Sequence, residues 1–181
     1  MVLVQFASFR AANGPRITNA STNFNVSMLD TPQITQSTAQ ATAIIRFTIP
    51  REQIQEVMGP GIGELMSVVA AQGITPAGPI YSHHFRMDPD IFDFEIGVPV
   101  ASPVTAAGRV TPGELPAVKV ARAVYRGPYE GLGDAWGEFS EWIAANGHTP
   151  AADLWECYAA GPESGPDSSK WRTELNRPLT S

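Results

Sequence analysis

The chain repeats part of its own sequence at a separation of 74 residues, and this repeat limits the folds it can adopt. Aligning residues 59–77 with residues 133–151 needs no gap and matches Gly59 with Gly133, Gly63-Glu64 with Gly137-Glu138, Ala70-Ala71 with Ala144-Ala145, Gly73 with Gly147 and Thr75-Pro76-Ala77 with Thr149-Pro150-Ala151. After a short change in length, Glu95 also corresponds to Glu174 and Pro99 to Pro178. The period is too long for a solenoid repeat of about 20–50 residues. The sequence therefore predicts two similar halves related by a pseudo-two-fold axis.

The second half shows the order of elements within each repeat. A strand-type run through Val124 and Tyr125 meets the turn-forming residues 126–128, and apolar residues then follow at helical spacing up to Asn146-Gly147. Two further strand-type segments lie within 153–158 and 171–179. Each repeat is therefore predicted to be a strand-helix-strand-strand unit.

The first half gives the same order with less regular boundaries. Strand patterns at 24–29 and 38–49 are candidates for an antiparallel pair, a helix interrupted near Gly59-Pro60-Gly61 is expected over 51–72, and strands at 80–87 and 91–100 form a hairpin. The predicted divisions are a tail or extra edge segment at 1–23, repeat one at about 24–100, a linker at 101–116 with a possible short strand near 109–111, and repeat two at about 117–181.

These patterns together predict an α+β fold, a tandem duplication in which one antiparallel sheet carries two helices on one face. The groove between the helices would have aromatic walls and a polar floor, the kind of place where small-molecule sites occur. The formal net charge of −6 and the pI of about 5.0 disfavour nucleic acid as a partner and tolerate a cationic ligand.

Composition also bears on location. No apolar run approaches the roughly 20 residues that a membrane-spanning helix needs, so no membrane partner is expected. The lone cysteine, Cys157, cannot form an intrachain disulfide and fits a reducing, cytoplasmic setting. His83 and His84 would point to opposite faces of a strand, so neither a metal nor a cofactor is expected. The oligomeric state is left open.

Glu156 is the candidate functional residue, because it lies among aromatic residues in a segment typical of a buried strand. Alternation places Trp155 and Cys157 on one face of that strand and Leu154, Glu156 and Tyr158 on the other. A desolvated carboxylate here would have a raised pKa and would serve as a cation anchor or a general base. The alternative is a strand glutamate that points to solvent or pairs with an arginine.

Several motifs of the second half resemble the GyrI-like small-molecule-binding domain, which is related to the effector-binding domains of AraC-type and MerR-type multidrug regulators and to the SOUL haem-binding proteins. The residues that carry the resemblance are Arg126-Gly-Pro-Tyr-Glu-Gly-Leu132, Asn146-Gly-His-Thr-Pro150, Leu154-Trp-Glu-Cys-Tyr158, Trp171-Arg-Thr-Glu-Leu175 and Pro178-Leu179. The resemblance covers about 118–179, and the repeat extends it less closely towards residue 24.

The resemblance implies a groove that holds bulky aromatic, often cationic ligands, with Glu156 as the buried anchor for drug or toxin sequestration or sensing. It also implies two alternatives: a hydrolase that opens the cyclopropane ring of DNA-alkylating natural products, as some stand-alone members do, and a protein-interaction module of the gyrase-inhibitor type. The chain departs from the family pattern at the repeat-one equivalent of Glu156, which is Ser82, so the groove is expected to be asymmetric in charge.

Further residues complete the predicted site. Glu95 and Glu174 are equivalent by the repeat, and one of them could share the groove with Glu156 so that a protonated carboxyl assists an ionised one. The alternative for Glu174 is a structural role, such as pairing with Arg172 or Arg177. The predicted catalytic residues are Glu156, Glu174 and Tyr158. The predicted ligand-binding residues are Glu156, Glu95, Trp155, Tyr81, Trp136, Tyr129, Phe85 and Tyr125, although Trp136 also fits simple helix packing.

Overall fold

The structure, a computed structural model, describes residues 28–180. The expected tail at 1–23 and most of the strand expected at 24–29 lie outside this range. The strands are β1 (Gln33–Gln36), β2 (Gln40–Pro50), β3 (Tyr81–Met87), β4 (Ile91–Pro99), β5 (Thr111–Leu115), β6 (Lys119–Arg126), β7 (Leu154–Ala160) and β8 (Arg172–Pro178). The α-helices are α1 (Ile54–Ala71) and α2 (Leu132–Ala145), and the 3₁₀ turns are η1 (Arg51–Gln53), η2 (Tyr129–Gly131), η3 (Pro162–Ser164) and η4 (Ser168–Lys170).

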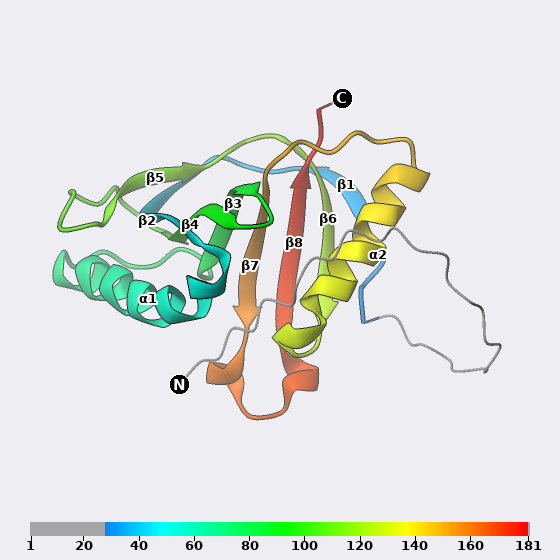
Figure 1. Cartoon of the computed structure of the whole chain (residues 1–181). Coiled ribbons are helices and arrows are strands. Elements are labelled where there is room, and N and C mark those ends of the chain that lie inside the picture. The colour runs from blue at the N-terminus through cyan, green and yellow to red at the C-terminus, as the bar shows by residue number, and fades with distance from the viewer. Residues whose placement is uncertain (1–27, 181) are drawn as a thin grey trace.

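The strands form one antiparallel sheet in the order β1-β6-β8-β7-β3-β4-β2-β5. Repeat one supplies β2, α1, β3 and β4, and repeat two supplies β6, α2, β7 and β8, so the two sets are arranged symmetrically about the β3–β7 junction. Both helices lie on the same face of the sheet, one over each half (Figure 1). The predicted α+β duplication is therefore confirmed.

The pseudo-two-fold axis passes between Ser82 and Glu156. These residues face each other in the β3–β7 register, and they are also equivalent by the repeat separation of 74 residues. When a residue pairs with its own repeat equivalent, the axis that relates the repeats must pass between the two residues. Backbone contacts obey the same symmetry, because the Ala77 amide donates to the Pro99 carbonyl and the Ala151 amide donates to the Pro178 carbonyl, both at 2.8 Å.

The short strands that precede the two repeats, β1 and β5, are exchanged between the halves. β1 precedes β2 but pairs with β6, whereas β5, which lies in the segment expected to be a linker, pairs with β2. The chain therefore crosses behind the sheet twice, at 37–39 and 116–118. Ser37 joins these crossovers: its hydroxyl lies 2.6 Å from the Pro116 carbonyl and accepts from the Val118 amide at 2.9 Å. The sequence predicted that 24–29 would pair with 38–49. Leu29 does not make this pairing, because it bridges to Tyr125 of β6 instead.

α1 runs without interruption through Gly59-Pro60-Gly61, so the expected break is wrong. Proline removes one amide donor and leaves the carbonyl of the preceding turn, at Glu56, without its helical partner. Both Pro60 and Glu56 are on the exposed side of α1, where water can satisfy that carbonyl. The buried side, with Met58 and Leu65, stays packed on the sheet and outweighs the local propensity.

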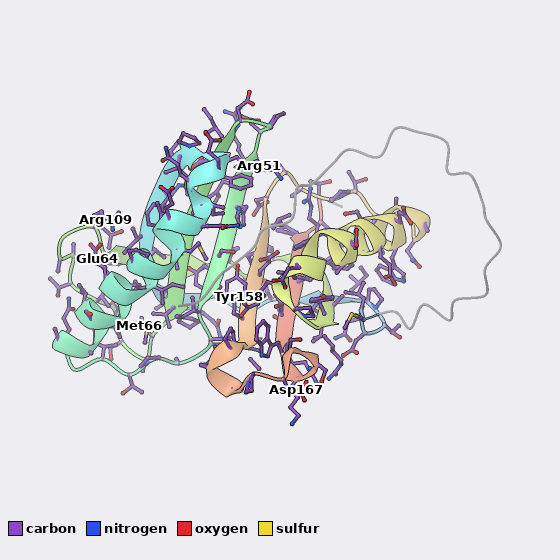
Figure 2. The ribbon with its side chains drawn as sticks, turned by 60° about the horizontal axis from the view of Figure 1, so that its bottom comes forward. Arg51, Glu64, Met66, Arg109, Tyr158 and Asp167 are labelled. Atoms are coloured by element: carbon purple, nitrogen blue, oxygen red, sulfur yellow. The ribbon has the colours of Figure 1, made fainter. Side chains whose placement is uncertain are left out.

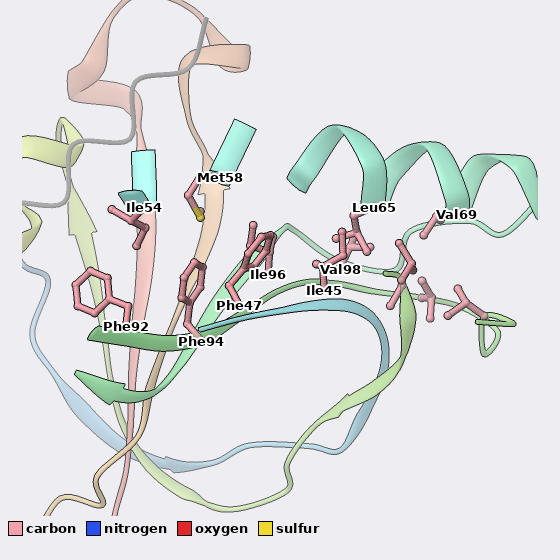
Figure 3. Packing of buried hydrophobic residues seen from close by; sticks show 14 residues of the cluster. Ile45, Phe47, Ile54, Met58, Leu65, Val69, Phe92, Phe94, Ile96 and Val98 are labelled. Atoms are coloured by element: carbon pink, nitrogen blue, oxygen red, sulfur yellow. The ribbon is translucent and has the colours of Figure 1, made fainter. Parts of the chain in front are cut away.

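Buried apolar residues form one cluster beneath each helix and a third on the other side of the sheet. Figure 3 shows the first cluster, in which Met58 of α1 lies over Phe94 and Leu65 lies over Ile45 and Val98. The second is centred on Phe139 of α2. The third, behind the sheet, contains Tyr81, Leu115, Val120 and Trp155. None of the helices among residues 28–180 is long and apolar enough to cross a membrane.

Candidate functional site

Glu156 is buried at the centre of the sheet, on the face that carries the helices, with 2% of its surface exposed. The Trp136 indole N–H, from α2, donates to Oε1 at 2.6 Å, and the Tyr158 hydroxyl donates to Oε2 at 2.9 Å. Within residues 28–180, no lysine, arginine or histidine lies at ion-pair distance from this carboxylate. The site therefore holds a carboxylate with neutral donors and without a protein counter-charge.

Burial raises the pKa of Glu156 above the ordinary glutamate value, because the charged form loses its hydration. The hydrogen bonds from Trp136 and then from Tyr158 act in the opposite direction, since both stabilise the ionised form. A carboxylate in these surroundings gains free energy from any cation that comes close, because the charge of that cation is little screened by water.

The hydrogen bonds continue from Tyr158 into the first repeat. The Tyr158 oxygen lies 2.8 Å from the Ser82 hydroxyl, which lies 3.1 Å from Nε2 of His84. Burial lowers the pKa of His84 to about 3, so this imidazole is neutral and can carry its proton on Nε2. With Glu156 ionised, the donors then point in one direction, from His84 through Ser82 and Tyr158 to the carboxylate.

A pocket of about 360 Å³ opens beside Tyr158, which Figure 2 places between the two helices. Its wall is mostly apolar and consists of Met58, Ile62, Pro79, Ile80, Tyr129, Tyr158, Ala159 and Glu163. The ring of Tyr129 stands edge-on to Tyr158 at a centroid distance of 5.8 Å and also contacts Trp171 at 5.2 Å. The Glu156 carboxylate thus lies one hydrogen bond behind the wall of an aromatic pocket.

The other predicted carboxylates lie on the opposite face of the sheet. Glu95 and Glu174 are register partners of His83 and Cys157, which alternate out of phase with Glu156. The expectation that one of them shares the groove with Glu156 is therefore corrected. Glu174 is partly exposed and lies 3.4 Å from Nε of Arg122, so it pairs with an arginine, but with Arg122 and not with the expected Arg172 or Arg177.

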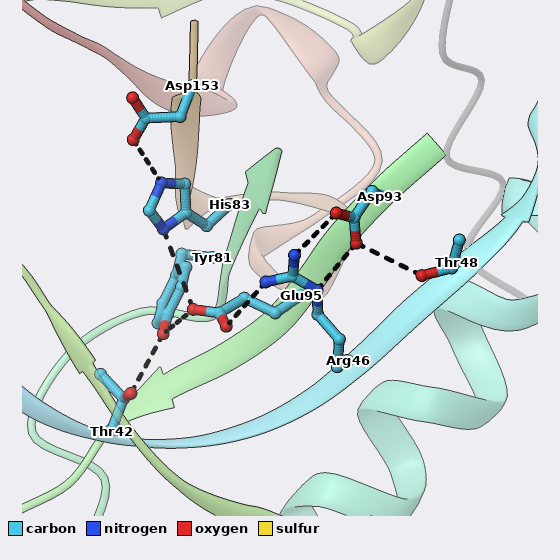
Figure 4. A network of polar contacts seen from close by, with 8 residues as sticks. All are labelled: Thr42, Arg46, Thr48, Tyr81, His83, Asp93, Glu95 and Asp153. Atoms are coloured by element: carbon cyan, nitrogen blue, oxygen red, sulfur yellow. Dashed lines mark hydrogen bonds and ion pairs between the residues drawn. The ribbon is translucent and has the colours of Figure 1, made fainter. Parts of the chain in front are cut away.

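Glu95 belongs to a buried network that Figure 4 shows. It accepts from the Tyr81 hydroxyl at 3.3 Å and lies 3.9 Å from Nδ1 of His83, whose Nε2 is 2.8 Å from Asp153. Burial raises the pKa of Glu95, and His83 and then Tyr81 lower it. Asp153 comes from repeat two, so this network ties the halves together behind the sheet.

The predicted aromatic residues are divided between the two faces. Trp136, Tyr129 and Tyr158 surround Glu156 on the helix side. Tyr81, Trp155 and Phe85 lie behind the sheet, where Tyr81 and Trp155 are core residues and Phe85 stacks beneath the guanidinium of Arg46 at 3.8 Å. Tyr125 is buried beneath α2, and its hydroxyl donates to the Pro128 carbonyl at 2.9 Å, outside the pocket wall.

Sequence reasoning missed the wall that the first repeat contributes to the pocket. Met58 and Ile62 lie four residues apart on α1, and Ile80 precedes β3. Their helical spacing indicated only a buried side of α1, because apolar residues that face a pocket follow the same period as those that face a core. Ser82 had a clearer signal, since it is the repeat equivalent of Glu156, whereas nothing in the sequence placed His84 beside it.

Comparison with known proteins gives a family match and several similar folds. The model of the GyrI-like small molecule binding domain matches residues 30–179. The EcmrR C-terminal domain has a TM-score of 0.73 at 21% identity and covers 83% of this chain and 98% of its own. EcmrR in its DNA complex also has a TM-score of 0.73, at 20% identity over 86% of this chain, which spans 59% of the EcmrR chain.

SAV2435, solved bound to tetraphenylphosphonium, has a TM-score of 0.58 at 15% identity and covers 84% of this chain and 95% of its own. No curated protein sequence matches the chain. At these identities, the solved structures share the fold with this chain. The family model, which spans both repeats, the Ser82–Glu156 axis and the pocket beside it, shows more: the chain belongs to the GyrI-like small-molecule-binding domain family.

Proposed function

We propose that the protein binds a bulky aromatic cation in the pocket beside Tyr158, between α1 and the η2 turn, with Glu156 as the counter-charge. The observation that carries this proposal is the buried carboxylate, which has two neutral donors and no basic partner among the described residues. Isolated buried charges are costly, and proteins normally pair them. A cationic ligand in the adjoining pocket would supply the missing partner.

The pocket wall suits the rest of such a ligand. Tyr129 and Tyr158 present aromatic surface to a cation or a flat ring, while the thioether of Met58 adapts to irregular shapes. Glu163 adds a second carboxylate to the lining. SAV2435, which shares the fold, was solved with a cation of this chemistry, the lipophilic tetraphenylphosphonium.

A matched pair of ligands tests the proposal directly. Tetraphenylphosphonium and tetraphenylborate have nearly the same shape and opposite charge, so shape alone cannot separate them. We expect tetraphenylphosphonium to quench the tryptophan fluorescence saturably and to bind at least about tenfold more tightly than tetraphenylborate, because an unlike charge near a buried carboxylate is worth more than about 1.4 kcal/mol. Equal affinities would show that Glu156 does not select the charge of the ligand.

The affinity for the cation is expected to depend on pH. Because burial raises the pKa of Glu156, the free site takes up a proton as the pH falls through a value above 4.5, and cation binding weakens over that range. The stability of the fold depends on pH in the opposite direction to the cation affinity. Protonated Glu156 favours the folded state at low pH, and this contribution to the free energy of unfolding disappears as the pH rises through the raised pKa. Titrations of tetraphenylphosphonium from pH 4.5 to 8 check the binding, and a flat profile in Glu156→Gln is the control.

Hydrolysis of a strained cyclopropane is a second candidate, favoured by the hydrogen bond between Tyr158 and Glu156. Glu156 would take a proton from water as the water oxygen bonds to a ring carbon, and the breaking C–C bond would send its electron pair to a conjugated carbonyl of the substrate, which is then protonated. Chromatography of ring-opened product tests this candidate. Equal rates for wild type, Glu156→Gln and Tyr158→Phe would exclude it.

A further inference from the structure

A second cavity, of about 400 Å³, lies behind the sheet, on the face away from the helices. The crossovers that exchange β1 and β5 form one wall, with Ser37, Leu115 and Pro116, and the back of the sheet forms the other, with Trp155 and Cys157. Because Trp155 and Cys157 alternate with Glu156 along β7, this cavity opens on the opposite face of the sheet from Glu156, and it meets the helix-side pocket only at Pro79 and Ala159, which line both.

The charged groups of this cavity are held in place by a buried amide. Asn176 is fully buried; its Oδ1 accepts from Nε of Arg122 at 2.8 Å, and its Nδ2 donates to Oε1 of Glu174 at 3.1 Å. Arg122 and Glu174 both line the cavity, and their side chains are 28% and 29% exposed. The amide therefore fixes one edge of the guanidinium and leaves its Nη edge without a hydrogen-bond partner among residues 28–180.

Comparison of the two repeats shows that this arrangement is particular to the second one. In repeat two, Arg122 of β6 pairs with Asn176 of β8. The equivalent pair in repeat one is Ile44 of β2 with Gly97 of β4. Ile44 therefore takes the place of Arg122, and Gly97 takes the place of Asn176. In repeat one the Tyr81 ring covers Gly97 and fills the space. The same positions thus hold an apolar core in one half and an ordered Arg–Asn–Glu group beside a cavity in the other.

We propose that the cavity behind the sheet binds a small monocarboxylate with a flat apolar body, held by the Nη edge of Arg122. A guanidinium edge offers two parallel donors that match the two oxygens of a carboxylate. The Glu174 carboxylate lies 3.4 Å from Nε, so a ligand with two negative charges is disfavoured and a single charge is accepted. Trp155, Leu115 and the prolines of the lining provide the apolar contact.

Isothermal titration calorimetry with 2-naphthoate and its neutral analogue 2-naphthamide tests this assignment. We expect one molecule of 2-naphthoate per chain, at least tenfold weaker binding of 2-naphthamide, and at least a tenfold loss of naphthoate affinity in Arg122→Gln. Glu156→Gln should bind 2-naphthoate like the wild type, since Glu156 lies on the other face. Equal binding of the acid and the amide, or loss of binding in Glu156→Gln alone, would overturn the assignment.

Substitutions at the rim keep the test decisive if Arg122→Gln fails to fold. Thr38 is exposed and lines the cavity, so its replacement leaves the core intact. Thr38→Lys should strengthen 2-naphthoate binding and Thr38→Glu should weaken it, each by severalfold, while tetraphenylphosphonium binding stays unchanged in both. If neither variant changes naphthoate affinity, the carboxylate does not bind in this cavity, whatever the outcome for the cation on the helix side.

Discussion

Replacing Glu156 with glutamine is expected to weaken tetraphenylphosphonium binding by about 30-fold or more, the loss typical when one partner of a buried charge pair is removed, about 2–5 kcal/mol. Glutamine keeps the size of the side chain and can still accept from the Trp136 indole and contact the Tyr158 hydroxyl, which now lie 2.6 and 2.9 Å from the carboxylate. The change therefore removes the charge with little effect on the packing. Tryptophan fluorescence or calorimetric titration measures the effect.

Glu174→Gln is the matched control, because Glu174 lies in β8, next to the strand that carries Glu156, but on the other face of the sheet. We expect it to bind tetraphenylphosphonium like the wild type. Unfolding by urea provides a second measurement: Glu156→Gln should be at least as stable as the wild type near neutral pH, since it no longer buries a charge without a counter-charge. A variant that folds normally and keeps full affinity for the cation would show that Glu156 is not the anchor.

The repeat made the centre of the site predictable from the sequence. The separation of 74 residues paired Ser82 with Glu156 before any register was known, and the structure shows these two residues facing each other across the axis. Period-two alternation also placed Trp155 and Glu156 on opposite faces of β7. Both inferences rest on local geometry, which a strand imposes whatever its neighbours are.

The exchange of β1 and β5 could not be predicted in the same way. β1 has four residues and pairs with β6, more than 80 positions further along the chain, so its partner is decided by tertiary packing. The division of the carboxylates between the faces was missed for a different reason: the repeat shows that Glu95 and Glu174 are equivalent, but equivalence to each other does not relate either residue to Glu156. The face on which each of them lies, relative to Glu156, depends on how β4 pairs with β3 and β8 with β7. That register is a property of the folded sheet.

Gly97→Ala is expected to destabilise the protein by about 3 kcal/mol, towards the upper end of the range for overpacking a buried core. A methyl group on Gly97 would overlap the ring of Tyr81, which crosses directly over this position. The ring cannot move aside without cost, because the buried Tyr81 hydroxyl bonds to Thr42 at 3.1 Å and to Glu95 at 3.3 Å. Nor can β4 shift freely, since it is paired with β2 on one side and β3 on the other.

Gly63→Ala provides the opposite case within the same chain. Gly63 lies on the exposed side of α1, and a methyl group there would meet no atom within 4 Å, so higher helix propensity should stabilise the protein by up to about 1 kcal/mol. Urea unfolding of both variants gives the comparison. If Gly97→Ala proved as stable as the wild type, the Tyr81 ring would have to lie elsewhere, and the contrast between a filled repeat one and an open cavity in repeat two would lose its structural basis. Opposite signs at the two glycines would instead support Tyr81 as the side chain that fills this space in the first repeat.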